Sequence, residues 1–226
     1  MNGYPAAIIW DLDGTLIDSA ADLAQALNTL LREHGYAGLD EDHVRTMIGD
    51  GVQKLIERGF KAAGVAIRGI RLQDVMARFM LIYSLCATNK TRLYPGARPI
   101  LQDFSDAGVR QGICTNKPES IAKQILSTFS IAGHFDVVVG GDTMAAKKPD
   151  PLPLLSCLAA LNVMPRDSMM IGDSGVDVAT ARAVHMPVGI VITGYAREPV
   201  TTLGADFLID SLSSLPASIA GLRKAG

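Results

Sequence analysis

The chain has 226 residues, of which 48% are hydrophobic and 19% charged, and its formal net charge is −2. This composition is typical of a folded globular protein and argues against intrinsic disorder. With 21 basic and 23 acidic side chains and no long run of either sign, the sequence shows no electrostatic footprint for nucleic acid or an anionic membrane.

Near its start the chain carries a short apolar run, Ala7 to Trp10, followed by Asp-Leu-Asp-Gly-Thr over residues 11–15. The run predicts a buried strand, and the acidic pair predicts a tight turn at the carboxyl end of that strand. On extended backbone Asp11 and Asp13 would point to the same face and repel each other, so we expect the chain to bend at Asp13, where Gly14 permits the bend. Because clustered carboxylates require a cation or a proton, this turn is the first candidate functional site.

From Asp18 to about Leu93 the hydrophobic spacing changes to that of helices. Helices are predicted between capping residues 18–22 and Gly35, and then over Glu41 to Ile48, Val52 to Ala63 and Leu72 to Ala87. No alternating segment interrupts them. The result is an all-helical block of about seventy residues, the size of a small domain.

From Tyr94 onward, helical and strand patterns alternate. Strands are predicted over Gln111 to Thr115, Phe135 to Val139, Met169 to Ile171, Val188 to Ile192 and Phe207 to Ile209. Helices are predicted over Ala97 to Ala107, Pro118 to Ser130, Pro151 to Leu161, Ser174 to Val184 and Ser213 to Leu222. Such alternation indicates right-handed βαβ units and a parallel sheet. We therefore expect an α/β core domain built from residues 1–18 and 93–226, with residues 19–92 inserted as an all-helical cap domain.

Polar side chains follow the predicted strands at one edge of this sheet, where the carboxyl ends of parallel strands meet. Asp11 and Asp173 are hard oxygen ligands of the kind that suits Mg²⁺. Thr115 offers a hydroxyl next to the N-terminus of a helix, which favours an anion, and Lys148 adds a positive charge. Each feature alone has an ordinary structural explanation, as a turn, a strand-end hydroxyl, a solvated lysine or a helix cap. Together, in this order, they indicate a phosphate site beside a carboxylate.

This arrangement suggests a chemistry. A carboxylate such as Asp11 can attack phosphorus and form a covalent intermediate, which divides one difficult displacement into two easier ones. Mg²⁺ and Lys148 reduce the repulsion between that carboxylate and a phosphate dianion. Asp13, around the bend, is placed to protonate the leaving oxygen and later to take a proton from water.

The residues Asp11-Leu12-Asp13-Gly14-Thr15, Thr115-Asn116, Lys148-Pro149 and Gly172-Asp173-Ser174-x-x-Asp177 resemble the four motifs of the haloacid dehalogenase superfamily. The resemblance covers essentially the whole chain, including a helical cap between the first and second motifs. It implies a doubly wound, Rossmann-like parallel sheet with the first strand in a central position, and Mg²⁺ as cofactor.

The same resemblance implies a role for each motif residue. Asp11 is expected to be the nucleophile and Asp13 the general acid and base. Thr115 and Asn116 are expected to bind phosphate, and Lys148 to hold phosphate and nucleophile together.

The metal site implied by the resemblance comprises Asp11, the backbone carbonyl of Asp13, and Asp173. Asp177 is expected to support this site, either as a ligand or through a contact with a ligand.

The resemblance also limits the branches of the family to which this chain can belong. The dehalogenase members do not use a second aspartate at the position of Asp13, and the phosphonate-cleaving members carry another residue there. Val44 to Val52 and Gly204 to Asp210 resemble the phosphoglycolate phosphatase branch. In that branch Gly194-Tyr195 is usually followed by Asn and a glycine-rich turn, whereas this chain has Ala-Arg-Glu-Pro at 196–199.

Cap residues are candidates for contact with a substrate carboxylate. Arg45 and Lys54 carry the right charge, although both also fit solvated helix faces. The turn Gly49-Asp50-Gly51 is the better candidate, because its glycines let the backbone approach a small ligand.

We therefore predict Mg²⁺-dependent hydrolysis of a small phosphomonoester, with 2-phosphoglycolate the first compound to try, through an aspartyl-phosphate. The alternative is a phosphomutase of the β-phosphoglucomutase type, and a remote alternative is a non-catalytic phospho-acceptor signalling module. The expected partner is a small phosphorylated metabolite, with no nucleic acid and no membrane, and the expected state is a monomer or homodimer. Three scattered cysteines, no evident signal peptide and no apolar stretch near the roughly 20 residues of a membrane helix predict a cytoplasmic protein.

Overall fold

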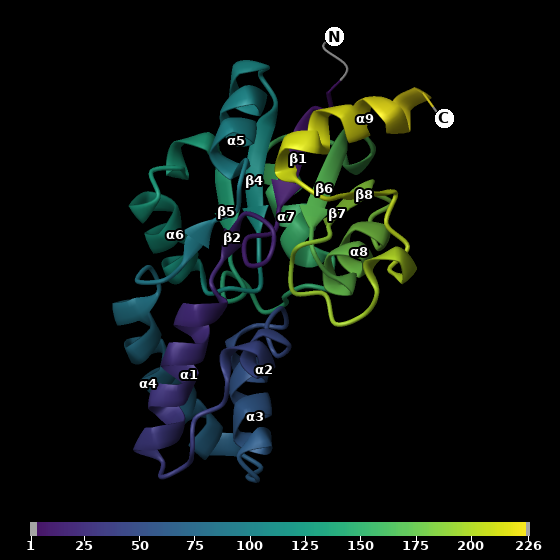
Figure 1. Ribbon diagram of the computed structural model, residues 1–226. Helices are drawn as coiled ribbons and strands as arrows, with labels where there is room; N and C mark the ends of the chain where they lie inside the picture. Colours follow the sequence, from purple (N-terminus) through teal and green to yellow (C-terminus); the bar gives the residue numbers. More distant parts are fainter. Residues whose placement is uncertain (1–3, 225–226) are drawn as a thin grey trace.

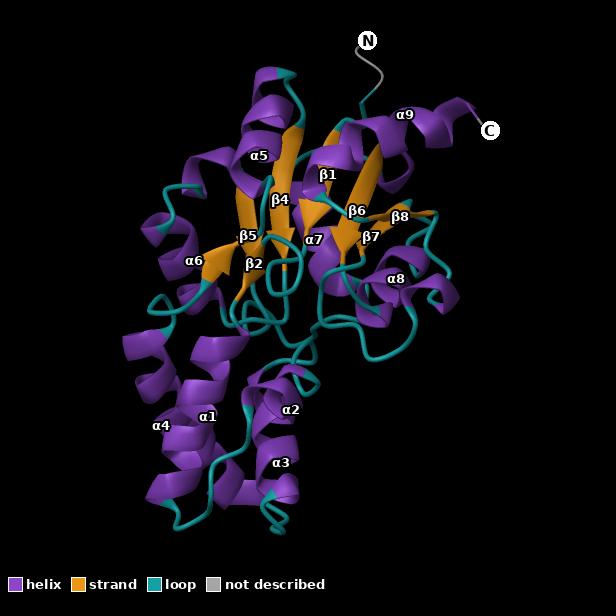
Figure 2. Cartoon of the chain, viewed as in Figure 1, coloured by secondary structure: helices purple, strands orange, loops and turns teal. Residues whose placement is uncertain are grey.

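A six-stranded parallel sheet forms the centre of the computed structural model, which describes residues 4–224 (Figures 1 and 2). Its strands are β1 (Ala7–Trp10), β4 (Arg110–Cys114), β5 (Val137–Val139), β6 (Ser168–Gly172), β7 (Val188–Val191) and β8 (Phe207–Ile209). Their spatial order is β5-β4-β1-β6-β7-β8. The first strand pairs with β4 on one side and β6 on the other, so it lies inside the sheet as predicted.

Helices cover both faces of the sheet. One face is covered by α5 (Ala97–Asp106), α6 (Glu119–Thr128) and α9 (Leu215–Lys224), and the other by α7 (Leu152–Ala160) and α8 (Gly175–Arg182). The alternation of side chains along β1 shows why both faces are buried. Ile8 and Trp10 join the apolar cluster under the first group of helices, whereas Ala7 and Ile9 join the cluster under the second. The doubly wound α/β core is confirmed.

The four helices of the insertion are α1 (Ala20–Glu33), α2 (Glu41–Arg45), α3 (Val52–Ala62) and α4 (Gly69–Cys86). They pack on one another beyond the carboxyl ends of the sheet strands (Figure 1). Fully buried side chains such as Leu30, Phe60 and Phe79 hold them together. The helical cap predicted from the 3.6-residue spacing is therefore present.

Two linkers join the helices to the sheet, and they pair with each other. Ile17–Asp18 (β2) and Arg92–Leu93 (β3) form a short antiparallel ribbon that the sequence did not predict. Strands of two residues are too short to show an alternating pattern. Just inside the ribbon, the buried Asp22 accepts hydrogen bonds from the backbone N–H groups of Lys90 and Thr91, which ties the start of α1 to the end of the insertion.

Some boundaries differ from the predictions. The helix expected to run to Ile48 ends at Arg45, because the following residues form a turn in which Gly49 and Gly51 have φ angles of +112° and +86°. Short 3₁₀ segments lie at Ala132–His134, Pro165–Asp167, Val200–Thr202 and Leu212–Ser214, and the last replaces the start of the predicted final helix.

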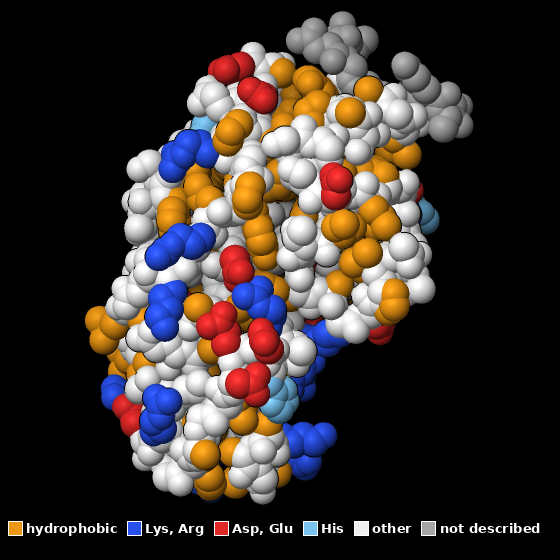
Figure 3. Space-filling model, in the orientation of Figure 1, with side chains coloured by type: hydrophobic (Ala, Val, Ile, Leu, Met, Phe, Trp, Pro, Cys, Tyr) orange, Lys and Arg blue, Asp and Glu red, His pale blue; other side chains and the backbone are white. Residues whose placement is uncertain are grey.

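The visible face of the molecule shows mixed charges. On the face shown in Figure 3, acidic and basic side chains lie interspersed over the lower half of the molecule. The cysteines Cys86, Cys114 and Cys157 are buried and free. Within residues 4–224, no helix combines the length and the apolar character needed to cross a membrane.

Candidate active site

The turn after β1 brings two motifs into contact. Asp11 continues the ladder, since its N–H donates to the carbonyl of Ile171 at 2.8 Å. The chain then turns at Gly14, whose φ is +83°. A Cβ atom at Gly14 would lie 2.3 Å from a carboxylate oxygen of Asp173, so the turn requires glycine both for its backbone angle and for its closeness to the β6 strand end.

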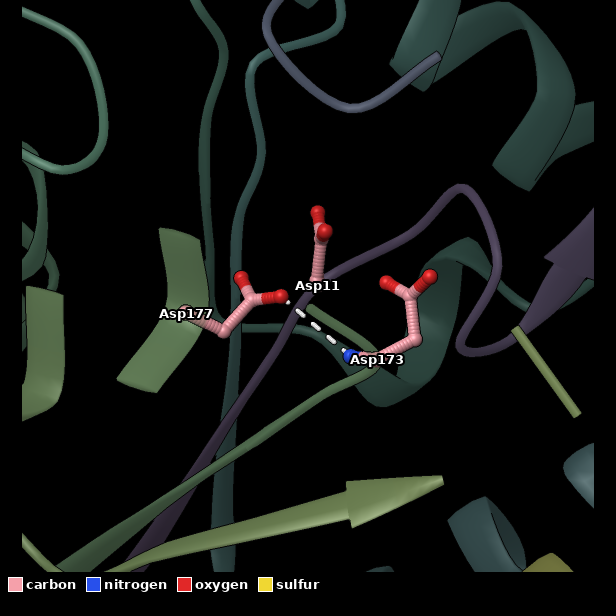
Figure 4. Close-up of side chains that lie close together, drawn as sticks. All are labelled: Asp11, Asp173 and Asp177. Carbon is pink, nitrogen blue, oxygen red and sulfur yellow. Dashed lines mark hydrogen bonds between the residues drawn. The ribbon is translucent and has the colours of Figure 1, made fainter. Parts of the chain in front are cut away.

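Three buried carboxylates converge where β1, β6 and α8 meet (Figure 4). Asp11, Asp173 and Asp177 each offer an oxygen, and these oxygens lie within 4.8 Å of one another. Lys148 lies among them, with Nζ 3.0 Å from Asp11 and 2.6 Å from Asp177. One ammonium group faces three carboxylates, so the cluster carries excess negative charge in a buried place.

The electrostatics of the cluster reflect that excess. Burial raises the pKa of Asp11 to about 6, although Lys148 opposes the rise. Burial, together with the charges of Asp177 and Asp11, raises the pKa of Asp173 well above its usual range. Burial alone would lower the pKa of Lys148, but the two neighbouring carboxylates raise it, so this side chain stays cationic.

The donor set fits a hard divalent cation such as Mg²⁺, which prefers oxygen ligands and offsets surplus negative charge. Asp177 is already fully engaged. One of its oxygens accepts from Lys148, and the other accepts from the backbone N–H groups of Asp173 and Ser174 and from the Ser174 hydroxyl. These contacts suit a residue that orients Asp173 better than one that binds the ion directly. Asp11 and Asp173 are therefore the carboxylates suited to the ion.

Asp13 lies on the cap side of the turn and has partners that the sequence did not reveal. It accepts from the Ser19 hydroxyl at 2.5 Å and from Nζ of Lys117 at 2.7 and 2.9 Å. Lys117 in turn donates to the hydroxyl of Tyr83 on α4 at 2.6 Å. Lys117 follows the Thr115-Asn116 motif directly, and that adjacency is the one signal that could have marked it.

Thr115 and Asn116 lie at the end of β4, next to this group, and both are buried. The Asn116 amide donates to the carbonyls of Gly49 and Lys148, each at 3.0 Å, and so links the cap turn to the core. Among the described residues, its carbonyl oxygen Oδ1 is a buried side-chain oxygen that has no hydrogen-bond partner.

These groups line one cavity, which has an empty volume of about 410 Å³ when the solvent at its mouth is included. From the core it is lined by Asp11, Asp13, Thr115, Asn116 and Lys117, and from the cap by Gly49, Gly51, Tyr83 and several apolar side chains. The predicted site residues at the ends of β1 and β4 therefore share one small space, which the cap closes from the other side.

The comparison with known proteins identifies the family to which this chain belongs. Residues 8–191 match the family of haloacid dehalogenase-like hydrolases. The chain belongs to this family. It is 42% identical over 215 residues to the phosphoglycolate phosphatase of Rhodospirillum rubrum, covering 93% of this chain and 89% of that protein.

Two further relatives point in the same direction. The phosphoglycolate phosphatase of Caulobacter vibrioides is 37% identical over 216 residues, with 96% of this chain and 90% of that protein covered. The crystal structure of a predicted phosphoglycolate phosphatase from Haemophilus somnus 129PT matches with a TM-score of 0.88 and 26% identity, over 96% of this chain and 99% of that one. The predicted resemblance to the phosphoglycolate phosphatase branch of the hydrolase family is confirmed.

In this hydrolase the predicted cap residues divide into two groups. Gly49 and Gly51 line the cavity. Arg45 instead pairs with Asp18 at 3.0 Å, and Lys54 pairs with Glu57 at 2.7 Å, so the structure brings neither to the cavity.

Asp50 is not among the residues that line the cavity, although it belongs to the same turn. It pairs with Arg58 and, at 2.7 Å, with Arg197. Arg197 belongs to the Ala-Arg-Glu-Pro segment in which this chain departs from the branch pattern, and it also donates to the carbonyls of Thr46 and Ile48. The segment in which this chain departs from the branch pattern therefore supplies contacts between the core and the cap.

Proposed function

We propose that this protein catalyses the Mg²⁺-dependent hydrolysis of a small phosphomonoester, with 2-phosphoglycolate as the substrate, through a phosphorylated Asp11. The observation that carries the proposal is the position of Asp11, a buried carboxylate that contacts Lys148 and lines a small cavity with Thr115. The relatives named phosphoglycolate phosphatase support the choice of substrate.

In the first half-reaction an oxygen of Asp11 attacks phosphorus, and the bond between phosphorus and the ester oxygen breaks. Asp13 gives its proton to the leaving oxygen, which departs as an alcohol. Lys148 and the Thr115 hydroxyl hold the phosphoryl oxygens, and the positive charge of Lys148 reduces the repulsion between nucleophile and substrate.

In the second half-reaction a water molecule gives a proton to Asp13 and attacks the same phosphorus. The bond between phosphorus and Asp11 breaks, inorganic phosphate leaves, and the Asp11 carboxylate is restored. Asp13 ends each cycle with the proton it began with, so one residue serves as both acid and base.

Asp11, Asp173 and the backbone carbonyl of Asp13 are the groups proposed to hold Mg²⁺. When bound, the ion neutralises surplus charge of the carboxylate cluster and withdraws charge from the phosphoryl group. Asp177 keeps Asp173 in place through the backbone hydrogen bond at 3.2 Å.

Phosphate release from a panel of small phosphomonoesters, assayed with and without Mg²⁺, tests this proposal. We expect turnover of 2-phosphoglycolate that requires the ion, and a loss of about 10⁴-fold or more in kcat for the Asp11→Asn variant. Asp103→Asn on the exposed side of α5 is the matched control and should retain activity. Hydrolysis at the original rate by the Asp11 variant would overturn the mechanism, and an isomer formed from glucose 1-phosphate without free phosphate would indicate a mutase.

A further inference from the structure

A substrate with a carboxylate needs a cation at the far end of its binding site. In 2-phosphoglycolate only an oxygen and a methylene separate phosphorus from the carboxylate carbon, so that cation must lie in the same cavity as Asp11. Among the described residues that line the cavity, Lys117 is the one basic side chain. Lys148, which is assigned to the phosphoryl group above, contacts Asp11 and Asp177 and is not among the residues that line the cavity.

We propose that Lys117 recognises the substrate carboxylate and thereby determines specificity, an inference that rests on the proposed function. Its side chain is 1% exposed, so its charge is not screened by solvent. Asp13 and Tyr83 fix its position from the core and from α4, and its ammonium group also lies 5.0 Å from the centre of the Tyr83 ring.

Lys117 can exchange one of its contacts for a ligand. An ammonium group has three N–H donors. Two of them contact the oxygens of Asp13, at 2.7 and 2.9 Å, and one contacts the Tyr83 hydroxyl, at 2.6 Å. A substrate carboxylate would take over one of the two contacts with Asp13, which keeps the other. The same cavity is walled by Leu23, Ile48 and Leu55, which exclude water and strengthen a charge-assisted hydrogen bond to a substrate carboxylate.

The cations expected from the sequence do not compete for this role. Arg45 and Lys54 both lie outside the cavity and pair with neighbouring carboxylates. Lys147 donates to the Asp50 carbonyl at 2.8 Å and is not among the residues that line the cavity. Lys117 is therefore the side chain with the charge, the burial and the location that the substrate requires.

A buried cation that recognises a carboxylate discriminates strongly against a neutral analogue, because the analogue leaves the charge without its new partner. We expect kcat/KM for 2-phosphoglycolate to exceed that for its amide, 2-phosphoglycolamide, by roughly 100-fold or more. Ethyl phosphate, which carries a methyl group in place of the carboxylate, is expected to be a similarly poor substrate.

The decisive experiment compares these substrates in the wild type and in Lys117→Met. Loss of Lys117 also disturbs Asp13, which slows every substrate, so the ratio of kcat/KM between acid and amide is the informative quantity. We expect that ratio to fall from roughly 100 to within a few-fold of 1. Lys123→Met, an exposed lysine on α6 that pairs with Glu119, is the matched control and should keep the wild-type ratio.

Lys117→Gln, which retains a donor for Asp13, carries the same prediction if the methionine variant does not fold. A separate measurement needs no change at Lys117. In the Asp11→Asn background, calorimetry is expected to show roughly 100-fold tighter binding of 2-phosphoglycolate than of its amide.

The outcomes separate the two proposals. If the wild type hydrolyses acid and amide equally well, or if the variant keeps a large ratio, Lys117 does not recognise the carboxylate, while phosphatase activity stands. If the wild type releases phosphate from none of the three compounds, the proposed function itself fails, and this inference fails with it.

Discussion

Replacing Asp11, the proposed nucleophile, is expected to make the metal-free protein more stable. Asp11 is buried, and its pKa rises from 3.8 to about 6 even with Lys148 3.0 Å away. The pKa of such a carboxyl group is higher in the folded state than in the unfolded state. Its contribution to stability is complete only below the pKa of the unfolded state, and it is lost as the pH rises through the pKa of the folded state. Asparagine keeps the shape of the neutral acid and does not ionise.

The magnitude follows from the two pKa values. At pH 7.5 the ionisation of Asp11 lowers the free energy of unfolding by about 3 kcal/mol, and at pH 5 by about half of that. In the presence of EDTA, Asp11→Asn is therefore expected to unfold at a temperature about 6–12 °C higher than the wild type at pH 7.5, since 1 kcal/mol corresponds to about 2–4 °C at this chain length.

Thermal unfolding followed by circular dichroism at both pH values measures this effect. The expected signature is an increase that is about twice as large at pH 7.5 as at pH 5. Asp103→Asn, on the exposed side of α5, controls for the loss of one negative charge. A variant less stable than the wild type at pH 7.5 would show that the contact with Lys148 outweighs the cost of burial, contrary to this prediction.

Three further predictions concern the surroundings of Asp11. Mg²⁺ is expected to raise the unfolding temperature more at pH 7.5 than at pH 5, because Asp11 and Asp173 must ionise to bind it. Asp173→Asn should abolish this increase, and an equal increase at both pH values would contradict the metal assignment. Arg197→Ala removes contacts between the core and the cap turn and should raise KM roughly 3- to 10-fold in steady-state kinetics. An unchanged KM would show that these contacts do not help to place the cap turn over the substrate. Ser174→Ala removes the hydroxyl that donates to Asp177 at 2.8 Å and should lower the free energy of unfolding, measured by urea titration, by about 1 kcal/mol. An unchanged free energy of unfolding would mean that this contact does not stabilise the fold.

The sequence was most informative where the physics is local. Ala7–Trp10 and Phe207–Ile209 lie where they were predicted, because short apolar runs bounded by polar residues define buried strands. Because parallel strands end at a common edge, Asp11, Thr115 and Asp173 could also be expected to meet.

Contacts between segments far apart in the chain were not predictable in the same way. Asp13 and Lys117 are 104 residues apart, and a single lysine after a strand carries no periodic signal that names its partner. Arg45 and Lys54 were candidates for contact with the substrate because of their charge, although solvated helix faces also fitted them. Each has a carboxylate three or four residues away on its own helix, Glu41 and Glu57, and such neighbours pair readily.

The most direct test of the mechanism is chemical trapping of phosphorylated Asp11. The enzyme is quenched during turnover of 2-phosphoglycolate and reduced with borohydride, which converts an aspartyl-phosphate to homoserine, and the peptides are sequenced by mass spectrometry. The mechanism predicts homoserine at position 11 in the wild type and none at position 13. Homoserine at another aspartate, or phosphate release with no trapped residue at all, would contradict it.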